Sequence, residues 1–221
     1  MPNAVITGIG HAVPPKILSN ADLEQIVETN DEWITQRTGI RERRICAPDE
    51  TASTLGADAA REALARAGVD AEELDMVIVG TVTGDYLFPS AACLIQHAIG
   101  ASNAGAFDVG AACAGFIYST SVAHSMIASG HSKKILVVGV DTLTKHIDWS
   151  DRSTCILFGD GAGAVVLEAR ENTDRGVLST VLLSDGAGAC HIIMDFGGGR
   201  YPASHSESAG KKNTIFMAGS E

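Results

Sequence analysis

The chain has 221 residues, 45% of them hydrophobic and 19% charged, a composition that excludes intrinsic disorder. Its length suits one large domain or two small ones and allows a sizeable core. Sixteen Lys and Arg residues against 27 Asp and Glu residues give a formal net charge of −11. Runs of Lys or Arg stop at two residues, so the sequence argues against a nucleic-acid-binding surface and against docking on anionic membranes.

Hydropathy and cysteine usage point to a cellular compartment. No segment approaches the roughly 20 apolar residues of a membrane helix, and the start Met1-Pro2-Asn3 lacks the basic residues of a signal peptide. The five cysteines are an odd number without a CxxC pair, at positions 46, 93, 113, 155 and 190. This spacing favours neither a metal site nor a disulfide framework. We therefore expect a cytoplasmic protein in a reducing environment.

Hydrophobic periodicity and helix-capping residues predict alternating strands and helices. In chain order we expect a strand at 5–9, a helix at 51–67, a strand at 76–82, a helix at 89–99, a strand at 106–109, a helix at 113–129, and strands at 135–140, 164–167 and 177–182. This alternation predicts an α/β fold with a mainly parallel sheet and helices on both faces. From about residue 184 the chain becomes glycine-rich and polar, which is typical of a long functional loop.

Cys113 stands in the sequence VGAACAGF, residues 109–116, between a predicted strand and a predicted helix. A thiol at a helix N-terminus feels the helix dipole, which favours the nucleophilic thiolate. Small neighbours let the backbone turn sharply and let a substrate approach. Cys113 is therefore a candidate nucleophile, although a free cysteine can equally be a small buried hydrophobic residue. The other cysteines lack this position, and Cys93 and Cys155 are expected in the core.

Two glycine-rich segments match phosphate-binding loops only in part. Residues 8–13 follow a strand but place Val13 where a dinucleotide fingerprint needs a third glycine, so we expect a tight turn there. Residues 159–164 precede a predicted strand and lack the Gly-Lys-Ser/Thr of a P-loop. Close backbone packing is the better interpretation of this second segment.

An aromatic residue and four arginines share the segment DEWITQRTGIRERR, residues 31–44. Trp33 offers a flat ring on which a nucleobase could stack, and guanidinium groups could hold phosphates. A solvated charged segment is the alternative that charge alone would favour. The seven histidines show no metal-ligand spacing such as HExxH.

Three segments, in this order, resemble β-ketoacyl-acyl-carrier-protein synthase III, a condensing enzyme of the thiolase-like superfamily. They are residues 31–43, the AACAGF turn at 111–116 and FGDGAGA at 158–164. The resemblance runs from the first strand to the end of the chain. It implies one of the two halves of the thiolase-like fold, with a five-stranded sheet, and it gives Cys113 the role of the residue that carries the acyl group.

The resemblance also implies a binding site for coenzyme A (CoA), which would arrive as a thioester substrate and not as a resident cofactor. Trp33, Arg37 and Thr38 match residues with which the family stacks and holds the adenine–ribose end of CoA. Arg152 matches an arginine that faces the same nucleotide. Phe88 matches a residue that one subunit inserts into its partner's acyl pocket, which implies a homodimer.

The implied reaction starts fatty-acid chains in two half-reactions. A short acyl group passes from acyl-CoA to Cys113 and CoA is released. Malonyl acyl carrier protein (malonyl-ACP) then loses carbon dioxide, and its enolate attacks the thioester to give β-ketoacyl-ACP. Covalent catalysis suits this chemistry because it divides one difficult step into two easier ones. The backbone N–H of Cys113 could donate to the oxyanion.

A condensing enzyme of this type also uses a His and an Asn, which the family carries in a second half of its chain. This sequence has no His-x-x-Asn and no Asn preceded by Gly. We therefore expect residues 1–183 to form the half that carries the nucleophile, and residues 184–221 to form the connecting loop and the start of the other half. The end, residues 216–221, resembles the opening of a helix of that second half. Condensation by these 221 residues alone is not expected.

Several other functions stay open. A related acyltransferase without condensation, a plant-type polyketide synthase and a hydroxymethylglutaryl-CoA synthase share this chemistry, although residues 31–43 favour synthase III over the last two. A different class is a non-catalytic half-chain that binds or regulates a complete synthase. A His motif and an Asn motif encoded downstream would favour the enzyme.

Overall fold

The computed structural model describes residues 1–205, 210 and 212–218. The chain forms two compact units, and each is considered by itself. The first comprises Met1–Pro14, Cys46–Thr142 and Asp160–Leu182. The second comprises Pro15–Ile45, Leu143–Gly159 and the chain from Leu183 onward.

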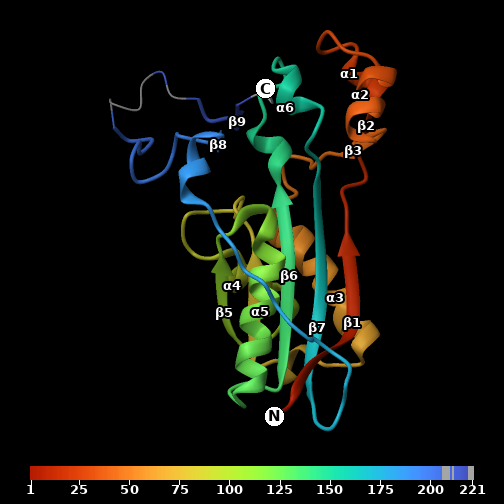
Figure 1. Ribbon diagram of the computed structural model, residues 1–221, viewed down its shortest axis with the longest axis vertical. Coiled ribbons are helices and arrows are strands. Elements are labelled where there is room, and N and C mark those ends of the chain that lie inside the picture. Colours follow the sequence, from red (N-terminus) through yellow and green to blue (C-terminus); the bar gives the residue numbers. More distant parts are fainter. Residues whose placement is uncertain (206–209, 211, 219–221) are drawn as a thin grey trace. The chain divides into compact units, whose positions relative to one another are not determined.

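The first unit contains a five-stranded sheet with the strand order β1-β7-β6-β4-β5 (Figure 1). The strands are β1 (Asn3–Ala12), β4 (Met76–Gly80), β5 (Gly105–Val109), β6 (Lys134–Thr142) and β7 (Asp160–Arg170). β4 pairs in parallel with β5 and β6, whereas β7 pairs antiparallel with both β6 and β1. Four strands therefore share one direction. β7 runs in the opposite direction. Its first residue, Asp160, lies opposite Thr142, the last residue of β6, so the connection between these two strands needs no crossover of the sheet.

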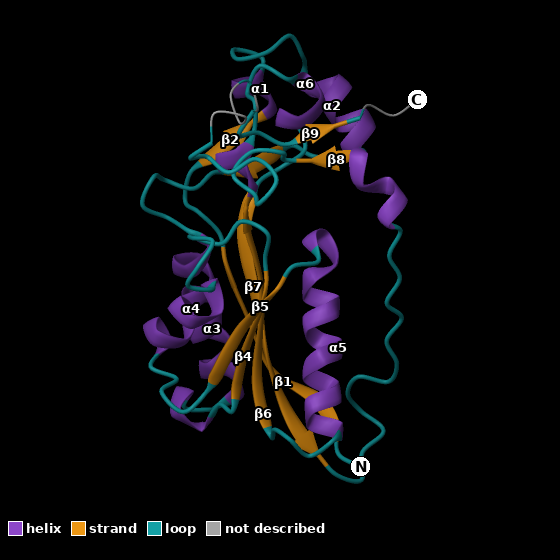
Figure 2. Ribbon diagram, turned by 90° about the vertical axis from the view of Figure 1, so that its left-hand side faces the viewer, coloured by secondary structure: helices purple, strands orange, loops and turns teal. Residues whose placement is uncertain are grey.

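Helices cover both faces of this sheet, as the sequence predicted. α3 (Ala52–Ala67) and α4 (Ala91–Ile99) lie on one face, and α5 (Gly115–Ala128) lies on the other (Figure 2). The predicted helix ends are confirmed for α3, because the Thr51 hydroxyl accepts a hydrogen bond from Thr54 N–H and Gly68 adopts a left-handed φ of 66°. A short 3₁₀ helix, η1 (Ala71–Glu73), follows α3.

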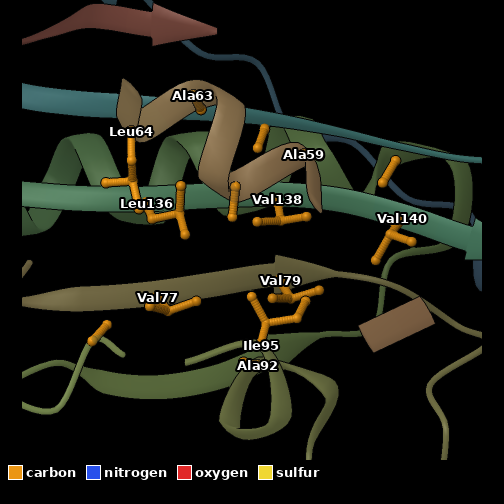
Figure 3. Close-up of a cluster of buried hydrophobic side chains, with 14 of the residues drawn as sticks. Ala59, Ala63, Leu64, Val77, Val79, Ala92, Ile95, Leu136, Val138 and Val140 are labelled. Atoms are coloured by element: carbon orange, nitrogen blue, oxygen red, sulfur yellow. The ribbon is translucent and has the colours of Figure 1, made fainter. Parts of the chain in front are cut away.

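The main core of the first unit packs α3 and α4 against the sheet. Ala59 and Ala63 of α3 face Leu136 and Val138 of β6, and Ile95 of α4 packs beside β4 (Figure 3). Small residues on α3 let the helix approach the strands closely.

The glycines of residues 8–13 do not form the tight turn that we expected. Gly8 and Gly10 lie inside β1, where an added Cβ would meet the carbonyl oxygens of Ala63 and Ala59, each at 2.1 Å. The absence of a side chain therefore serves close packing of α3 on an edge strand.

The strand expected at 177–182 is also absent from the described residues. This segment runs extended beside α5 (Figure 2), with Val177 N–H donating to the Ala4 carbonyl and the Thr180 hydroxyl 3.1 Å from that of Ser121. Leu178 and Val181 are 79% and 74% exposed. A β-branched run predicts extended backbone, but a strand also requires a series of backbone hydrogen bonds, and among the described residues only Val177 of this segment bonds to the edge strand β1.

The second unit is built from short elements. They are β2 (Ile17–Ser19), α1 (Asn20–Leu23), α2 (Asp31–Thr38), β3 (Glu42–Arg44), η3 (Leu143–His146), α6 (Arg152–Cys155), η4 (Gly186–Cys190), β8 (Ile192–Ile193) and β9 (Phe216–Met217). β2 pairs antiparallel with β3, and β8 pairs antiparallel with β9. A small core gathers Leu23, Ile34, Ile147, Cys155 and Ile156.

The end of the chain differs from its expected conformation. Phe216 and Met217, which we expected to open a helix, pair with β8. Residues 219–221 of the same expected helix lie outside the described residues. The division at residues 183 and 184 into a nucleophile-bearing half and a connecting segment stays a prediction.

Candidate active site

Cys113 lies in the first unit, on the 3₁₀ helix η2 (Ala112–Ala114) that joins β5 to α5. Its side chain is exposed, so the alternative of a buried hydrophobic cysteine is wrong in this structure. Ala112 before it has a φ of 44°, a left-handed conformation that is uncommon for a residue with a side chain and that marks local strain. The backbone turn thus presents the thiol at the surface.

Glycines hold the start of α5 against the sheet. A Cβ on Gly80, the last residue of β4, would lie 2.5 Å from the carbonyl carbon of Gly115, the first residue of α5. Gly139 of β6 makes a similar approach, where an added Cβ would lie 3.2 Å from the Cβ of Phe116. Cys113 is therefore fixed at the carboxyl ends of the parallel strands, where α/β sheets bind ligands, and beside the positive end of the α5 dipole.

The burial of Cys93 and Cys155 agrees only in part with the prediction that both lie in the core. Cys155 is buried, as expected, but Cys93 on α4 is exposed. Its sulfur lies 3.9 Å from the carbonyl oxygen of Ala106. An exposed position excludes Cys93 from the core and makes it a matched control for the reactivity of Cys113.

Phe88 lies in the loop between β4 and α4, also in the first unit. It is 85% exposed, and its neighbours Tyr86 and Leu87 are 65% and 87% exposed. Three consecutive large apolar or aromatic side chains in solvent form an exposed patch of the kind that marks an interaction surface. Phe88 is thus exposed on this loop, and its place in an acyl pocket stays a prediction.

Carboxylates hold this loop at its two ends, and the sequence patterns did not reveal them. The Asp141 carboxylate accepts hydrogen bonds from the Thr81 hydroxyl, Val82 N–H and Thr83 hydroxyl at 3.1, 3.0 and 2.8 Å. At the other end, Asp108 accepts bonds from the N–H groups that open α4, those of Ala91 and Ala92, both at 2.8 Å. Such charge-assisted bonds are stronger than neutral ones.

A third carboxylate holds the middle of the same loop. Asp85 accepts hydrogen bonds from the backbone N–H and the hydroxyl of Ser53 in the first turn of α3, at 2.9 and 2.7 Å. For Asp108 and Asp141, the sequence shows only an acidic residue within or directly after an apolar run. Its partners could not be read, because they lie 16 to 60 residues away.

Three of the four predicted nucleotide contacts meet in the second unit. The guanidinium carbon of Arg37 lies 4.4 Å from the centre of the Trp33 ring, and that of Arg152 lies 4.7 Å from it. Both distances are within the range of cation–π attraction. The structure therefore brings together an indole and two guanidinium groups from α2 and α6, which are more than one hundred residues apart in the chain.

Thr38, the fourth predicted contact, closes α2. Its hydroxyl donates to the Ile34 carbonyl at 2.8 Å and accepts from Ile40 N–H at 3.0 Å. Gly39 follows with a left-handed φ of 73°, which ends the helix. Thr38 thus has a structural role on this surface, and a contact with a nucleotide stays a prediction.

Arg152 begins the short helix α6. Its Nη1 donates to the Glu28 carbonyl at 3.2 Å, and the Asp151 carboxylate caps the helix by accepting from Ser153 N–H. Burial raises the pKa of Asp151, but hydrogen bonds from Ser153 and Thr154 outweigh it and hold this pKa below its usual range. Asp151 is therefore an ionised cap that fixes the base of the Arg152 side chain.

Among the described residues, no group of three or more His, Cys, Asp and Glu side chains is placed to hold a metal ion. Within the same part of the chain, no helix combines the length and apolar character that crossing a membrane requires.

Comparisons with known proteins decide the family. Residues 107–186 match the family model described as 3-oxoacyl-[acyl-carrier-protein (ACP)] synthase III. The chain is 47% identical to a β-ketoacyl-[acyl-carrier-protein] synthase III of Solibacter usitatus over 223 residues, all of this chain and 67% of that protein. This chain belongs to the β-ketoacyl-ACP synthase III family.

Two other similar proteins give information on the length and the fold of this chain. A synthase III of Caldanaerobacter subterraneus is 49% identical over 218 residues, 99% of this chain and 66% of that protein. The priming β-ketosynthase of the R1128 polyketide pathway has 39% identity and a TM-score of 0.87, over 97% of this chain and 63% of that one. The chain thus spans about two thirds of the length of its synthase III relatives, and its thiolase-like α/β fold is confirmed.

Proposed function

We propose that this protein starts fatty-acid chains as a β-ketoacyl-ACP synthase III. It moves a short acyl group from acyl-CoA to Cys113 and condenses it with malonyl-ACP, and the products are β-ketoacyl-ACP, carbon dioxide and CoA. The observation that carries the proposal is the exposed Cys113 on a strained strand-to-helix turn, in a chain of the synthase III family.

The first half-reaction is an acyl transfer between two sulfur atoms. The Sγ of Cys113 attacks the thioester carbonyl of acyl-CoA, a carbon–sulfur bond to CoA breaks, and the CoA sulfur takes up the proton that the thiol lost. The negative oxygen of the intermediate needs hydrogen-bond donors. The backbone N–H of Cys113 is a candidate donor, because the oxyanion forms on the carbonyl that becomes bonded to the Sγ of the same residue.

The second unit is suited to the nucleotide end of CoA. The Trp33 ring stacks adenine, and Arg37 and Arg152 supply positive charge for its phosphates. Adenine between Trp33 and Arg152 requires two stacking gaps of about 3.5 Å each, which exceeds the 4.7 Å now between ring centre and guanidinium. Arg152 therefore moves outward when the nucleotide enters.

The exposed Phe88 loop supports an assembly of two copies. In this proposal Phe88 of one subunit closes the acyl pocket of the other, which suits its 85% exposure. CoA is a thioester substrate in this scheme, and the reaction needs no resident cofactor. The cytoplasm is the compartment proposed, because the free cysteines suit a reducing environment.

The condensing half-reaction needs further groups. Decarboxylation of malonyl-ACP leaves an enolate, and this enolate attacks the acyl–Cys113 thioester so that Cys113 leaves as a thiolate. The His and Asn that would stabilise the enolate belong, in this proposal, to the third of the relatives' length that the chain does not span. The 221-residue chain alone is expected to acylate but not to condense.

Priming of a polyketide chain is the second candidate function. The structural similarity to the R1128 priming β-ketosynthase supports it. The same Cys113 chemistry applies, and the difference lies in the carrier protein that receives the product. Two further alternatives stay open. A related acyltransferase would acylate without condensing, and a non-catalytic half-chain partner would neither acylate nor condense.

The proposal is tested by following both half-reactions. The protein is incubated with acetyl-CoA and ¹⁴C-carboxyl-labelled malonyl-ACP, alone and with a separately expressed second half from a synthase III relative. We expect release of CoA in both mixtures and release of labelled carbon dioxide only when the second half is present. Absence of CoA release in both would contradict the proposed acyl transfer, and full turnover by the chain alone would contradict the assignment of the missing groups.

A further inference from the structure

The second unit contains a buried arginine that the proposed reaction does not use. Arg43 of β3 is 4% exposed. Its hydrogen bonds go to uncharged oxygens: Nη1 donates to Asn20 Oδ1 at 2.6 Å, and Nε and Nη2 donate to the Ile156 carbonyl at 3.1 and 2.6 Å. Burial lowers the pKa of Arg43, since a charge loses hydration there.

A buried charge with neutral partners is costly for stability. An apolar residue could fill the same volume at lower cost, so the arginine needs another explanation. The planar guanidinium offers several N–H groups in a fixed fork, which lets one side chain join two backbone segments at a defined separation. The segments that Arg43 joins are the two that carry the proposed nucleotide contacts.

On one side, Asn20 connects Arg43 to both ends of α2. The Asn20 side-chain amide donates to Asp31, the first residue of α2, at 2.7 Å and to the carbonyl of Ile40, just beyond the helix, at 2.9 Å. Asn20 is 2% exposed, so this connection is shielded from water. It orients the helix that bears Trp33.

On the other side, Arg43 binds the end of α6. Ile156 is the C-cap residue of that helix, and its carbonyl accepts both bonds from the guanidinium. Arg152 opens the same four-residue helix. A shift of Ile156 therefore moves the backbone from which Arg152 reaches the Trp33 ring.

We propose that Arg43 is a positioning residue for the nucleotide end of acyl-CoA, because its bonds to Asn20 and Ile156 set the separation between the Trp33 ring and Arg152. The inference rests on the proposed function and deepens it. A buried network, and not the side chains of Trp33 and Arg152 alone, then determines how tightly the nucleotide is held.

The test compares two acyl donors that differ only in the nucleotide. Acetyl-CoA carries it and acetylpantetheine does not, while both deliver the same acyl group to Cys113. Arg43→Lys keeps the charge but loses the fork. We expect the KM of Cys113 acylation to rise about tenfold for acetyl-CoA and to change less than about twofold for acetylpantetheine.

Controls separate this inference from the function on which it rests. Trp33→Ala should raise the KM of acylation for acetyl-CoA and not that for acetylpantetheine. Adding Arg43→Lys to this variant should raise the KM for acetyl-CoA no further. If Trp33→Ala leaves the ratio of the two donors unchanged, the proposed nucleotide site is wrong. If Trp33→Ala lowers that ratio but Arg43→Lys slows both donors equally or neither, the positioning role of Arg43 is wrong.

A second variant tests the same inference if Arg43→Lys does not fold. Asn20→Asp keeps the oxygen that Arg43 binds and removes the three bonds of the amide nitrogen, to Asp31, Thr35 and Ile40, so it breaks the connection on the α2 side. We expect the same selective loss with acetyl-CoA. Arg170→Lys, at an exposed arginine of the first unit, is the matched control that should leave both donors unchanged.

Discussion

The two units position their candidate site residues by different means. In the first, backbone approach places Cys113, since Gly80 and Gly115 let α5 begin directly on the end of a strand. In the second, short elements carry Trp33 and Arg152, and hydrogen bonds of buried side chains such as Arg43 hold them. A side chain placed by close backbone packing on a regular sheet therefore tolerates no added volume nearby, whereas side chains on short elements depend on buried polar contacts.

Gly80→Val should produce the largest effect, because it adds volume where the first unit has none. Its Cβ would lie 2.5 Å from the Gly115 carbonyl carbon, and overpacking of a well-packed core costs about 1–3 kcal/mol or more. We expect the free energy of unfolding, measured by urea denaturation, to fall by that amount and acylation of Cys113 to be lost. Gly84→Ala is the control, because its Cβ meets nothing closer than 3.6 Å. Equal loss in both variants would break the comparison.

Phe88→Ala should change acyl-chain selectivity without changing the fold. Removing the ring opens space for several methylenes, each worth about 0.8 kcal/mol when buried. The ratio of the second-order rate constant of Cys113 acylation by decanoyl-CoA to that by acetyl-CoA should therefore rise by one to two powers of ten, on the order of what two or three methylenes supply. Leu87→Ala, a neighbour of similar exposure, should leave the ratio unchanged. An unchanged ratio in Phe88→Ala would exclude this residue from the acyl pocket.

Asp108→Asn should have an intermediate effect on the first unit. The carboxylate binds two N–H groups at the start of α4, where negative charge is favourable. Loss of such charge-assisted bonds costs about 1–2 kcal/mol, which denaturant unfolding would measure. Asp58→Asn, at an exposed aspartate on α3, should change stability by less than about 0.5 kcal/mol. A larger loss at Asp58 than at Asp108 would show that the loop is not held by its carboxylates.

Ser150→Ala should give the smallest effect, and it tests a surface bond of the second unit. Hydrogen bonds from Ser150, followed by one from Lys212, lower the pKa of Asp148 from 3.8 to about 2. A lowered folded pKa means that the contribution is present above about pH 4 and is lost as the pH falls toward 2. Removing the Ser150 hydroxyl should move this pKa upward in a carboxyl NMR titration. A pKa that stays near 2 in Ser150→Ala would contradict the assigned cause.

Local features of the fold were predictable from the sequence. Thr51 and Gly68 mark the ends of α3 because capping depends on neighbouring residues alone. The direction of β7 was not predictable, since it follows from where the chain re-enters the sheet after residues 143–159. Gly8 and Gly10 were assigned to a turn because a glycine pair in sequence does not reveal the helix that packs on it.

Part of the candidate site was likewise predictable from the sequence. Cys113 shows its strand-to-helix position within eight residues of sequence. The grouping of Trp33 with Arg152 came from the family resemblance, and the structure confirms that these two side chains meet. The link through Arg43 had no signal in the sequence, because its partners Asn20 and Ile156 lie 23 and 113 residues away.

The most direct test of the account is to locate the acyl group on the protein. After incubation with ¹³C-acetyl-CoA, peptide mass spectrometry should find the acetyl label on Cys113 and not on Cys93, although both thiols are exposed. Cys113→Ala should carry no label, and Cys93→Ala should be labelled like the unchanged chain. Label on Cys93, or undiminished labelling of Cys113→Ala, would contradict the claim that the strand-to-helix turn makes Cys113 the nucleophile.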